Sequence, residues 1–359
     1  MKEQNAKTTT KNTVCAVVVT FNRKNFLLEC LESLCTQTEP PDAILIVDNA
    51  SIDGTAKELK KRRYIKKEPP ENQNNVWETG TEILSSTGKI IQFYYLRLPE
   101  NTGGSGGFFY GMKKAYELGY QWIWTMDDDV IVDKKALEIL KKYFYEPEVL
   151  ALSTIVLTKE RKIFVIHRGF FNLEKLFPNL QIPVPIEKYK DEKIPIEFSS
   201  FLGLMIKRDA ISKVGLPNPD FFIYNDDVDY SLRLSRKGKI LLIFHSIIID
   251  QNAKEEIPLL SKKILFFKVK RIPIVNFWRT YYHLRNKIYI GRKYSKKKFF
   301  FFFKVFLHMI KSIRSLLPIL LLDDYKKDRI KILFLPYIHG LKGTLGKKVE
   351  FKNGKIVWY

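Results

Sequence analysis

The sequence is short of cysteine, with Cys15, Cys30 and Cys35 the only three in 359 residues. Their odd number and their lack of metal-type spacing argue against a disulfide framework. We therefore expect reduced, mostly buried thiols, as in cytosolic proteins.

The sequence also lacks an apolar leader. Its first residues, Met1 to Lys11, are polar, so no signal peptide is expected. The apolar runs are shorter than the roughly 20 residues that a transmembrane helix needs, and lysines interrupt them. We therefore expect a protein that does not cross a membrane.

Acidic residues are outnumbered, since 39 Asp and Glu stand against 61 Lys and Arg. The formal net charge of +22 favours an anionic partner, which composition leaves open between nucleic acid, an acidic membrane surface and a lipid phosphate. Hydrophobic residues make up 45% of the chain, enough for one large domain and a smaller one.

Short β-branched runs alternate with helical patterns in the first half of the chain. Strands are expected at residues 14–20, 43–47, 90–98 and 121–126. A polar stretch at 60–89 is expected to be an inserted loop, with room for one short helix. This alternation predicts an α/β fold with a mostly parallel sheet. Ligands bind beyond the carboxyl ends of such strands, so the strand-end residues Thr20, Asp48 and Asp127 should line one crevice.

The second half keeps this pattern less regularly. The expected strands are residues 150–157, 162–166, 201–206 and 239–249, and the expected helix is 226–236. From about residue 264 the chain becomes basic, aromatic and helical. We predict a catalytic domain over residues 12–262 and a helical C-terminal region over 263–359.

Three adjacent carboxylates, Asp127, Asp128 and Asp129, follow the apolar strand WIWTM. They repel one another unless they are solvated or bind a cation. An acidic turn would explain the triplet without a ligand. Its place at a strand end, beside the expected crevice, favours a site for a hard cation.

A glycine-rich segment, NTGGSGGF, begins at Asn101 and is expected to be a turn that enters a helix around residues 112–118. Glycines let the backbone approach a ligand closely and leave amides free at a helix N-terminus. The pattern is neither GxGxxG nor a Walker loop. A plain flexible loop is the alternative.

Three more carboxylates, Asp226, Asp227 and Asp229, stand at the start of the expected helix 226–236. The helix dipole favours acids there, so capping is one explanation. Capping needs only one acid, however, and a carboxylate beside a reacting centre can act as general base for a sugar hydroxyl.

Five segments occur together in one order: VVVTFNR, IVDNASIDGT, NTGGSGGF, WTMDDDV and FFIYNDDVDYSLRL. With them the chain, from about Val14 to Asn252, resembles the family 2 inverting glycosyltransferases of the GT-A fold. The glycine-rich segment and the full acidic triplet are most similar to galactofuranosyltransferases, with rhamnosyltransferases next. The resemblance implies transfer of galactofuranose from UDP-galactofuranose, or alternatively of rhamnose from dTDP-rhamnose, and a Mg²⁺ or Mn²⁺ cofactor.

The resemblance also implies a set of donor-binding positions. These are Thr20, Asn22, Arg23, Asp48, Asn49, Asn101, Gly103, Gly104, Gly106, Gly107 and Asp128. Within the set, Thr20, Asn22 and Arg23 would line the nucleotide pocket, and Asp48 would accept a hydrogen bond from the pyrimidine ring. The glycines would pass close to the donor.

Catalytic and metal-binding roles are implied in the same way. Asp227 matches the family's base, or Asp226 if the register shifts by one, and Asp229 would hold acceptor hydroxyls or support the base. Asp127 and Asp129 would contact the metal and the sugar phosphate.

A further metal ligand, commonly a histidine in this family, falls on Asp250 in the alignment from Gly238 through KILLIFHSIIID. His245 lies a few residues too early, and Asp250 is a good oxygen ligand for magnesium or manganese. His245 and the absence of a third protein ligand are the alternatives.

The C-terminal region contains Lys296 to Lys298 followed by five phenylalanines, Phe299 to Phe303. Basic and bulky apolar residues together are typical of an interfacial membrane helix, and such a helix also suits a domain or oligomer interface. Upstream, WRTYYHLRN (278–286) has helical spacing. It is either a helix packed on the core or a site for an acceptor or lipid phosphate.

Two other classes of function compete with sugar transfer. A nucleic-acid-binding protein would explain the charge, but the basic residues gather around Phe-rich helices and not in an RNA-reading sheet. A nucleotidyltransferase would also use metal-binding acids but would release pyrophosphate. We expect the partners to be a sugar-nucleotide donor and a glycan or polyprenyl-linked acceptor, and not nucleic acid. We also expect a peripheral location on the inner face of the cell membrane. The sequence allows a homo-oligomer.

Overall fold

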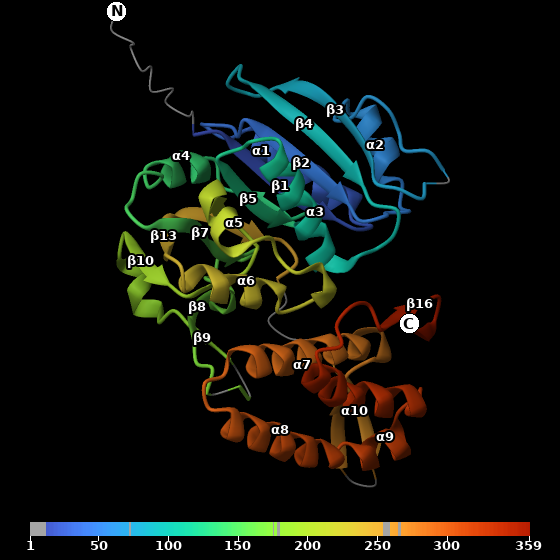
Figure 1. The fold of residues 1–359 in the computed structure, drawn as a ribbon. Helices are drawn as coiled ribbons and strands as arrows, with labels where there is room; N and C mark the ends of the chain where they lie inside the picture. The colour runs from blue at the N-terminus through green and yellow to red at the C-terminus, as the bar shows by residue number, and fades with distance from the viewer. Residues whose placement is uncertain (1–11, 72, 175, 178–179, 254–258, 265–266) are drawn as a thin grey trace, which may run out of the picture.

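The computed structural model describes residues 12–71, 73–174, 176–177, 180–253, 259–264 and 267–359. The segment Met1–Lys11, on which the signal-peptide prediction rests, lies outside the described residues. Figure 1 shows an α/β part that contains the N-terminal half and, below it, a helical C-terminal part.

A ten-stranded sheet forms the centre of the α/β part. Its strands are β1 (Val14–Thr20), β2 (Ala43–Asp48), β3 (Trp77–Leu84), β4 (Ile90–Arg97), β5 (Trp122–Asp127), β6 (Val130–Val132), β7 (Val149–Thr158), β10 (Lys193–Ile196), β12 (Leu204–Lys207) and β13 (Lys239–Asp250). The order is β10-β13-β7-β12-β5-β1-β2-β4-β3, and β6 pairs with β13. A smaller sheet contains β8 (Arg168–Phe171), β9 (Gln181–Pro183) and β11 (Phe198–Ser199).

Strands β1, β2, β4, β5, β7 and β13 run in one direction, and β3, β6, β10 and β12 run in the other. The predicted α/β fold with a mostly parallel sheet is therefore confirmed. Parallel strands need crossover connections, which the intervening helices supply.

Helices cover both faces of the sheet. They are α1 (Lys24–Cys35), α2 (Thr55–Lys61), α3 (Gly103–Glu117), α4 (Ala136–Lys141), α5 (Arg208–Val214) and α6 (Asp226–Ser235). Every residue of β1 is buried, because successive side chains point to opposite faces and each face is covered. Val14, Ala16 and Val18 share a hydrophobic cluster with α1 and α4, and Cys15 and Val17 share one with α3 and α6.

Three local predictions are wrong. The glycine-rich segment is not a turn before a helix, since α3 begins at Gly103. Residues 60–89 contain the edge strand β3, whose residues alternate between exposed and half-buried, a weaker signal than a buried run. Residues 162–166 form only an isolated bridge at Ile163 and the start of a 3₁₀ turn, because the chain there bends back at the sheet's carboxyl edge.

The C-terminal part is helical, as predicted, with two additional hairpins. It contains β14 (Leu260–Ile264), β15 (Phe267–Arg271), α7 (Ile274–Tyr294), α8 (Lys298–Ile313), α9 (Leu316–Leu322), α10 (Lys326–Lys342), β16 (Val349–Lys352) and β17 (Lys355–Trp358). Helices α7 and α10 approach closely at Gly340, where an added Cβ would lie 2.7 Å from the Arg285 carbonyl oxygen.

Helices α8 and α9 change one expectation. Lys298–Leu322 is a 25-residue helical stretch with mean hydropathy 1.7, of which 11% of the most apolar window is buried. The prediction that every apolar stretch is too short to span a membrane is wrong on length. Length and composition alone do not distinguish a membrane span from a helix lying on a surface.

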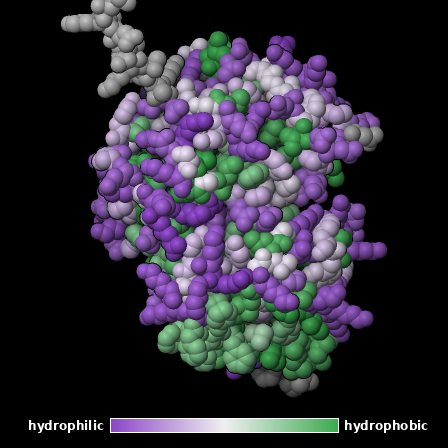
Figure 2. All heavy atoms as spheres, viewed as in Figure 1, coloured by the Kyte–Doolittle hydropathy of each residue, from purple (hydrophilic) through white to green (hydrophobic). Residues whose placement is uncertain are grey.

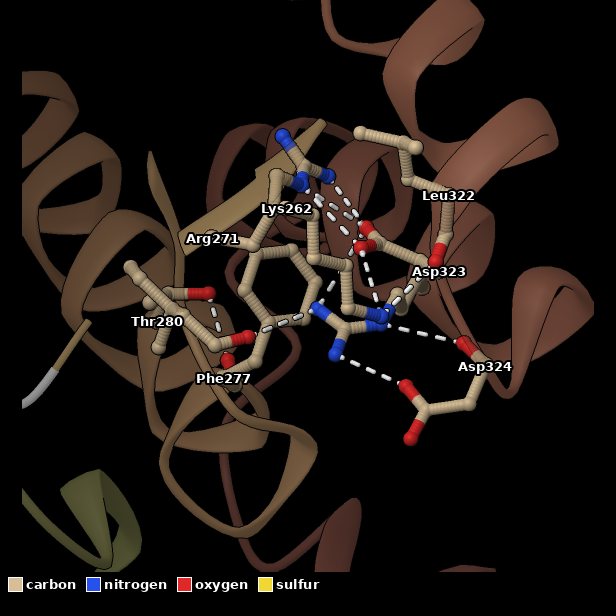
Figure 3. Close-up of polar contacts among 9 residues, drawn as sticks. Lys262, Arg271, Phe277, Thr280, Leu322, Asp323 and Asp324 are labelled. Atoms are coloured by element: carbon tan, nitrogen blue, oxygen red, sulfur yellow. Dashed lines mark hydrogen bonds and ion pairs between the residues drawn. The ribbon is translucent and has the colours of Figure 1, made fainter. Parts of the chain in front are cut away.

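A buried aspartate holds the first hairpin of the C-terminal part to its helices (Figure 3). The carboxylate of Asp323 is fully buried and accepts hydrogen bonds from Arg271 Nε, at 3.1 Å for each oxygen. Arg329 Nη1 and Lys262 Nζ lie 3.7 and 3.9 Å from its oxygens. Asp323 is thus the common counter-ion of three basic side chains.

Replacing Asp323 with alanine should lower the free energy of unfolding by about 3–5 kcal/mol, because buried guanidinium groups lose their counter-ion. The matched control is Asp324→Ala, since Asp324 is 57% exposed and pairs with Arg329 at 3.0 Å. That change should cost at most about 1 kcal/mol. Urea unfolding of both variants measures the difference, and equal destabilisation would contradict it.

Candidate active site

The polar ends of the like-directed strands meet at one edge of the sheet, as predicted. Thr20 at the end of β1 pairs in register with Asp48 at the end of β2. Val19 pairs with Asp127, the last residue of β5. Asp250 ends β13 opposite Val130, which directly follows the acidic triplet.

Side chains from β1 and from the loop after it contact the acidic triplet and partly balance its negative charge. Asp128, only 2% exposed, accepts hydrogen bonds from Thr20 Oγ1 at 2.7 Å and Arg23 Nη1 at 3.3 Å. The same Arg23 nitrogen lies 2.5 Å from an oxygen of Asp129. Two of the residues expected to line a nucleotide pocket therefore contact the triplet.

Negative charge at this edge exceeds what Arg23 balances. Burial raises the pKa of Asp127 well above its usual range, and Asp129, Asp128 and Asp250 raise it further. Burial and Asp129 also raise the pKa of Asp250 to about 6. Carboxylates in this state suit a hard divalent cation by charge and by oxygen chemistry. Among the described residues, however, no three His, Cys, Asp or Glu side chains converge closely enough to form a metal site.

The two alternatives for the further metal ligand occupy different places. Asp250 lies next to the triplet, and the amide of the following Gln251 donates to the Asp129 carbonyl at 2.9 Å. His245 is exposed, within the irregular pairing between Ile243 and Ile247 of β13. The position of Asp250 beside Asp129 favours it over His245.

Asp48 is enclosed by the protein. Its carboxylate is fully buried and accepts hydrogen bonds from Ser51 N at 2.7 Å, Tyr95 Oη at 2.6 Å and Arg97 Nη1 at 2.8 Å. Because this carboxylate is fully buried, recognition of a pyrimidine by Asp48 would require neighbouring groups to move aside. Arg97 was missed from the sequence, although its position at the end of β4 resembles that of Asp48 at the end of β2.

Three asparagines shape the loops around this edge. Asn22, with φ +54°, accepts at Oδ1 from Ile52 N at 2.7 Å. Asn49 donates to the Gly103 carbonyl at 2.8 Å and accepts from Thr102 N at 2.8 Å. Asn101 accepts from Gly103 N at 2.8 Å. Asn49 and Asn101 therefore fix the start of α3 relative to the end of β2.

The four glycines of the first turns of α3 differ in what surrounds them. Gly103 has φ +73°, and an added Cβ would lie 2.0 Å from the Phe222 carbonyl oxygen. At Gly106 a Cβ would meet Thr102 Oγ1 at 2.2 Å, and at Gly107 it would meet Val19 Cγ1 at 2.4 Å. Only Gly104 of these four has open space within 4 Å. Packing against the protein thus explains three of the glycines, and a ligand could approach at the fourth.

The second acidic group stands at the N-terminus of α6, close to the glycines. The amide of Ser105 donates to the Phe222 carbonyl at 3.1 Å, which joins α3 to the segment before α6. Burial and the adjacent Asp226 raise the pKa of Asp227 to about 8. Burial raises the pKa of Asp226 to about 6, while Ser105 and backbone amides favour its ionised form. A carboxyl group tuned in this way can accept a proton near neutral pH.

A buried arginine near Asp227 was missed from the sequence. Arg168 is 1% exposed and donates to the Thr154 carbonyl at 2.7 Å and to Ser200 Oγ at 3.2 Å. Its positive charge opposes the rise in the pKa of Asp227. No motif marks Arg168, because the chain folds it under Asp227 only through the small sheet of β8, β9 and β11.

Asp229 has a different environment from the one expected. It is 1% exposed and accepts hydrogen bonds from Arg233 Nε at 3.0 Å, Lys293 Nζ at 2.9 Å and Tyr294 Oη at 2.7 Å. Two of these three partners belong to α7. Asp229 thus holds α7 against α6, and these contacts leave its carboxylate enclosed.

The chain matches a known family over this part of the structure. Residues 15–215, more than half of the chain, match the family described as Glycosyl transferase family 2. The chain belongs to glycosyl transferase family 2. The matched residues contain the glycines of α3 and the acidic triplet, and they end before α6.

Two curated relatives carry the same name. The family 2 chain is 29% identical to galactofuranosyltransferase GlfT1 of Mycolicibacterium smegmatis over 229 residues, 63% of this chain and 66% of that protein. It is 28% identical to GlfT1 of Mycobacterium tuberculosis over 230 residues, 63% of this chain and 65% of that protein. The similarity thus spans just under two thirds of each relative.

Solved structures show weaker likeness to the family 2 chain. GalNAc-T7, crystallised with UDP, GalNAc and Mn²⁺, has a TM-score of 0.49 and 13% identity, over 68% of this chain and 44% of that one. TarS of S. aureus has a TM-score of 0.43 and 13% identity, over 93% of this chain and 44% of that one.

The glycines of the family 2 chain allow a paired test. Gly103→Ala should lower the free energy of unfolding by about 1–3 kcal/mol or more, since the new Cβ overlaps the Phe222 carbonyl at a positive φ. Gly104→Ala should keep or raise the melting temperature, because alanine favours the helix and meets nothing. Calorimetric unfolding of both variants measures the two changes in stability. Equal losses of stability would contradict the assignment.

Proposed function

We propose that this protein is a metal-dependent inverting glycosyltransferase that moves galactofuranose from UDP-galactofuranose to a hydroxyl of a growing cell-surface glycan or lipid-linked acceptor. Family membership supports transfer of a sugar from a nucleotide donor to a glycan. The name of the two relatives supports galactofuranose. Rhamnose from dTDP-rhamnose is the second candidate, motivated by the resemblance of the glycine-rich segment.

One observation carries this proposal: the acidic strand ends and the N-terminus of α6 converge on the start of α3. Asn49 at the end of β2 binds the Gly103 carbonyl, and the Phe222 carbonyl lies against Gly103 and Ser105 from the other side. A donor on the strand ends would therefore lie next to the carboxyl groups that begin α6. We assign residues 12–262 to the catalytic domain and 263–359 to the C-terminal region.

Asp127, Asp129 and Asp250 would supply oxygen ligands to a magnesium or manganese ion, because a cation would relieve the repulsion between these carboxylates. In this structure the three side chains are not close enough together to enclose an ion, so binding would have to draw them towards one another. Such an ion, when bound, neutralises negative charge on the departing diphosphate. Arg23 already pairs with Asp128 and Asp129 and would add positive charge on the nucleotide side.

Asp227 would act as the general base. It takes the proton of the acceptor hydroxyl while that oxygen bonds to the anomeric carbon and the bond to the diphosphate breaks. This single displacement inverts the anomeric centre and releases the nucleoside diphosphate. Only ionised Asp227 can accept the proton, so its raised pKa makes transfer increase as the pH rises towards about 8.

The proposal predicts that the wild-type protein with Mn²⁺ releases UDP from UDP-galactofuranose when an acceptor is present. Asp227→Asn keeps the shape of the side chain but cannot accept the proton, so transfer should fall by about 10²–10⁴-fold while UDP binding stays near wild type. A coupled assay of UDP release and calorimetric titration of UDP measure the two quantities.

The matched control is Asp226→Asn, a neighbouring buried carboxyl that should retain more activity than Asp227→Asn. Wild-type turnover by Asp227→Asn would refute the base assignment. Turnover of dTDP-rhamnose alone would select the second candidate sugar, and release of pyrophosphate would indicate a nucleotidyltransferase.

The outer surface of α8 and α9 supports a location at a membrane. Figure 2 shows a hydrophobic band at the end of the molecule where Figure 1 places these helices. Its large exposed side chains are Phe299, Phe300, Phe302, Phe303, Phe306, Leu307, Ile310, Ile313, Leu317, Leu320 and Leu321. Lysines precede and interrupt this band, and the net charge is +22. We infer that the band inserts into the surface of an anionic bilayer.

Vesicle binding tests this inference. The protein should sediment with vesicles of phosphatidylglycerol and phosphatidylcholine. Replacing Phe302 and Phe303 with serine should weaken binding by about 10- to 100-fold per residue, because burying each ring contributes about 1.5–3 kcal/mol. Tyr145→Ser, which removes an 84% exposed aromatic of the catalytic domain, is the control. A protein that ignores vesicles and instead forms dimers through this band would contradict the membrane assignment.

A further inference from the structure

The segment that leads into α6 has an unfavourable backbone. Phe222, Tyr224 and Asn225 have φ values of +65°, +65° and +63°. Asparagine tolerates this left-handed region, but large side chains such as phenylalanine and tyrosine rarely occupy it. Such a backbone persists only where neighbouring groups hold it in place.

The groups that hold this segment come from α7. The side-chain amide of Asn286 donates to the carbonyl oxygens of Phe221, Ile223 and Tyr224 at 3.1, 2.9 and 2.7 Å. One amide group thus binds three carbonyl oxygens within four residues of the strained backbone. Asn286 is fully buried, so water does not compete for these carbonyls.

Arg285 supports the same segment and orients Asn286. Its Nε donates to Asn286 Oδ1 at 2.8 Å, and its Nη2 donates to the Phe221 carbonyl at 3.0 Å. Its Nη1 donates to the Gly346 carbonyl at 2.6 Å, beyond α10. Arg285 therefore ties the segment to two separate parts of the C-terminal region.

The same segment contacts both halves of the candidate active site. The Phe222 carbonyl accepts from Ser105 in α3, and α6 with Asp226 and Asp227 begins one residue after Asn225. In Figure 1, α6 lies just above α7. A shift of residues 221–225 would therefore move the carboxyl groups relative to the glycines.

We propose that Arg285 and Asn286 are positioning residues that hold the carboxylate of Asp227 in its reactive place through the strained segment 221–225. This inference rests on the proposed function for the role of Asp227, and it makes the C-terminal region part of the active site. It also decides between the two interpretations of WRTYYHLRN for these two residues: they bind backbone carbonyls of the protein and not an acceptor or a lipid phosphate.

Filling the space between α7 and the segment 221–225 would not by itself require an arginine and an asparagine at positions 285 and 286. Burial lowers the pKa of the Arg285 guanidinium, which shows that its position costs solvation of the charge. Apolar side chains of similar volume would fill the same space without that cost. Hydrogen bonds to carbonyls at fixed positions are what the arginine and asparagine add.

The test is Asn286→Asp, which keeps the size of the side chain but replaces the donating N–H groups by an acceptor that repels the three carbonyls. We expect kcat for transfer from UDP-galactofuranose to an alkyl glycoside acceptor to fall by about 10²-fold, as for a misplaced catalytic group. The KM for the donor and the affinity for UDP should stay within about threefold of wild type, because the strand-end residues are untouched. Arg285→Lys should show the same split, and Arg292→Lys, at an exposed position of α7, is the matched control.

A rescue variant separates positioning from general stability. Tyr224→Gly removes an exposed side chain from a position with positive φ, which glycine adopts without strain. Combined with Asn286→Asp, it should recover part of the lost kcat. Hydrogen exchange of a peptide covering residues 221–228 should accelerate in Asn286→Asp, and not in Arg292→Lys, whatever the enzyme's substrate.

The outcomes are distinguishable from those of the proposed function. Loss of activity in Asp227→Asn with wild-type kcat in folded Asn286→Asp overturns the positioning role alone. Unchanged exchange over residues 221–228 in both Asn286→Asp and Arg285→Lys also overturns it. Suppose instead that hydrogen exchange over residues 221–228 accelerates in Asn286→Asp but the wild-type protein turns over no sugar nucleotide. That result supports the positioning role of Arg285 and Asn286 and refutes the proposed function.

Discussion

The candidate active site depends on a tight contact between Gly103 and the carbonyl oxygen of Phe222. No side chain fits there, since an added Cβ would lie 2.0 Å from that oxygen. The contact brings the first turn of α3, which Asn49 fixes to the end of β2, against the segment that leads into α6. The strand ends proposed to hold the donor and the carboxyl groups at the start of α6 therefore share one small region.

Charge is unevenly distributed within that region. The triplet and Asp250 place four carboxyl groups at one sheet edge, where Arg23 provides the nearest balancing charge. Burial without full compensation is costly in a folded protein, and it is common where a ligand later supplies the missing charge. By contrast, the carboxylates of Asp229 and Asp323 are more deeply buried than those of Asp127 and Asp250, but they have two and three basic partners, which gives them a structural explanation.

The C-terminal region has an inner face that contacts the segment around α6 and an outer face that is apolar and exposed. Its inner helix, α7, contributes Arg285, Asn286, Lys293 and Tyr294 to the segment around α6. Its outer helices, α8 and α9, present large apolar side chains to the surroundings. A lipid-linked acceptor held at the bilayer by the outer face would lie on the same protein unit that positions the proposed base. That arrangement gives one reason for joining the two parts in one chain.

The sequence by itself determined the sheet, the family and the position of the acidic groups. Runs of β-branched residues without polar alternation, such as residues 14–20, predict buried parallel strands. The order of the five motifs identifies the family from the sequence alone. Thr20, Asp48 and Asp127 could be placed at one edge because parallel strands end on the same side.

Tertiary structure alone decided which carboxylates are enclosed by partners from elsewhere in the chain. Asp48 and Asp229 look like Asp127 and Asp227 in the sequence, but Arg97, Lys293 and Tyr294, distant along the chain, fold onto them and occupy their oxygens. The roles of Arg168, Arg285 and Asn286 depend likewise on contacts between segments tens of residues apart, and local sequence patterns carry no record of such contacts.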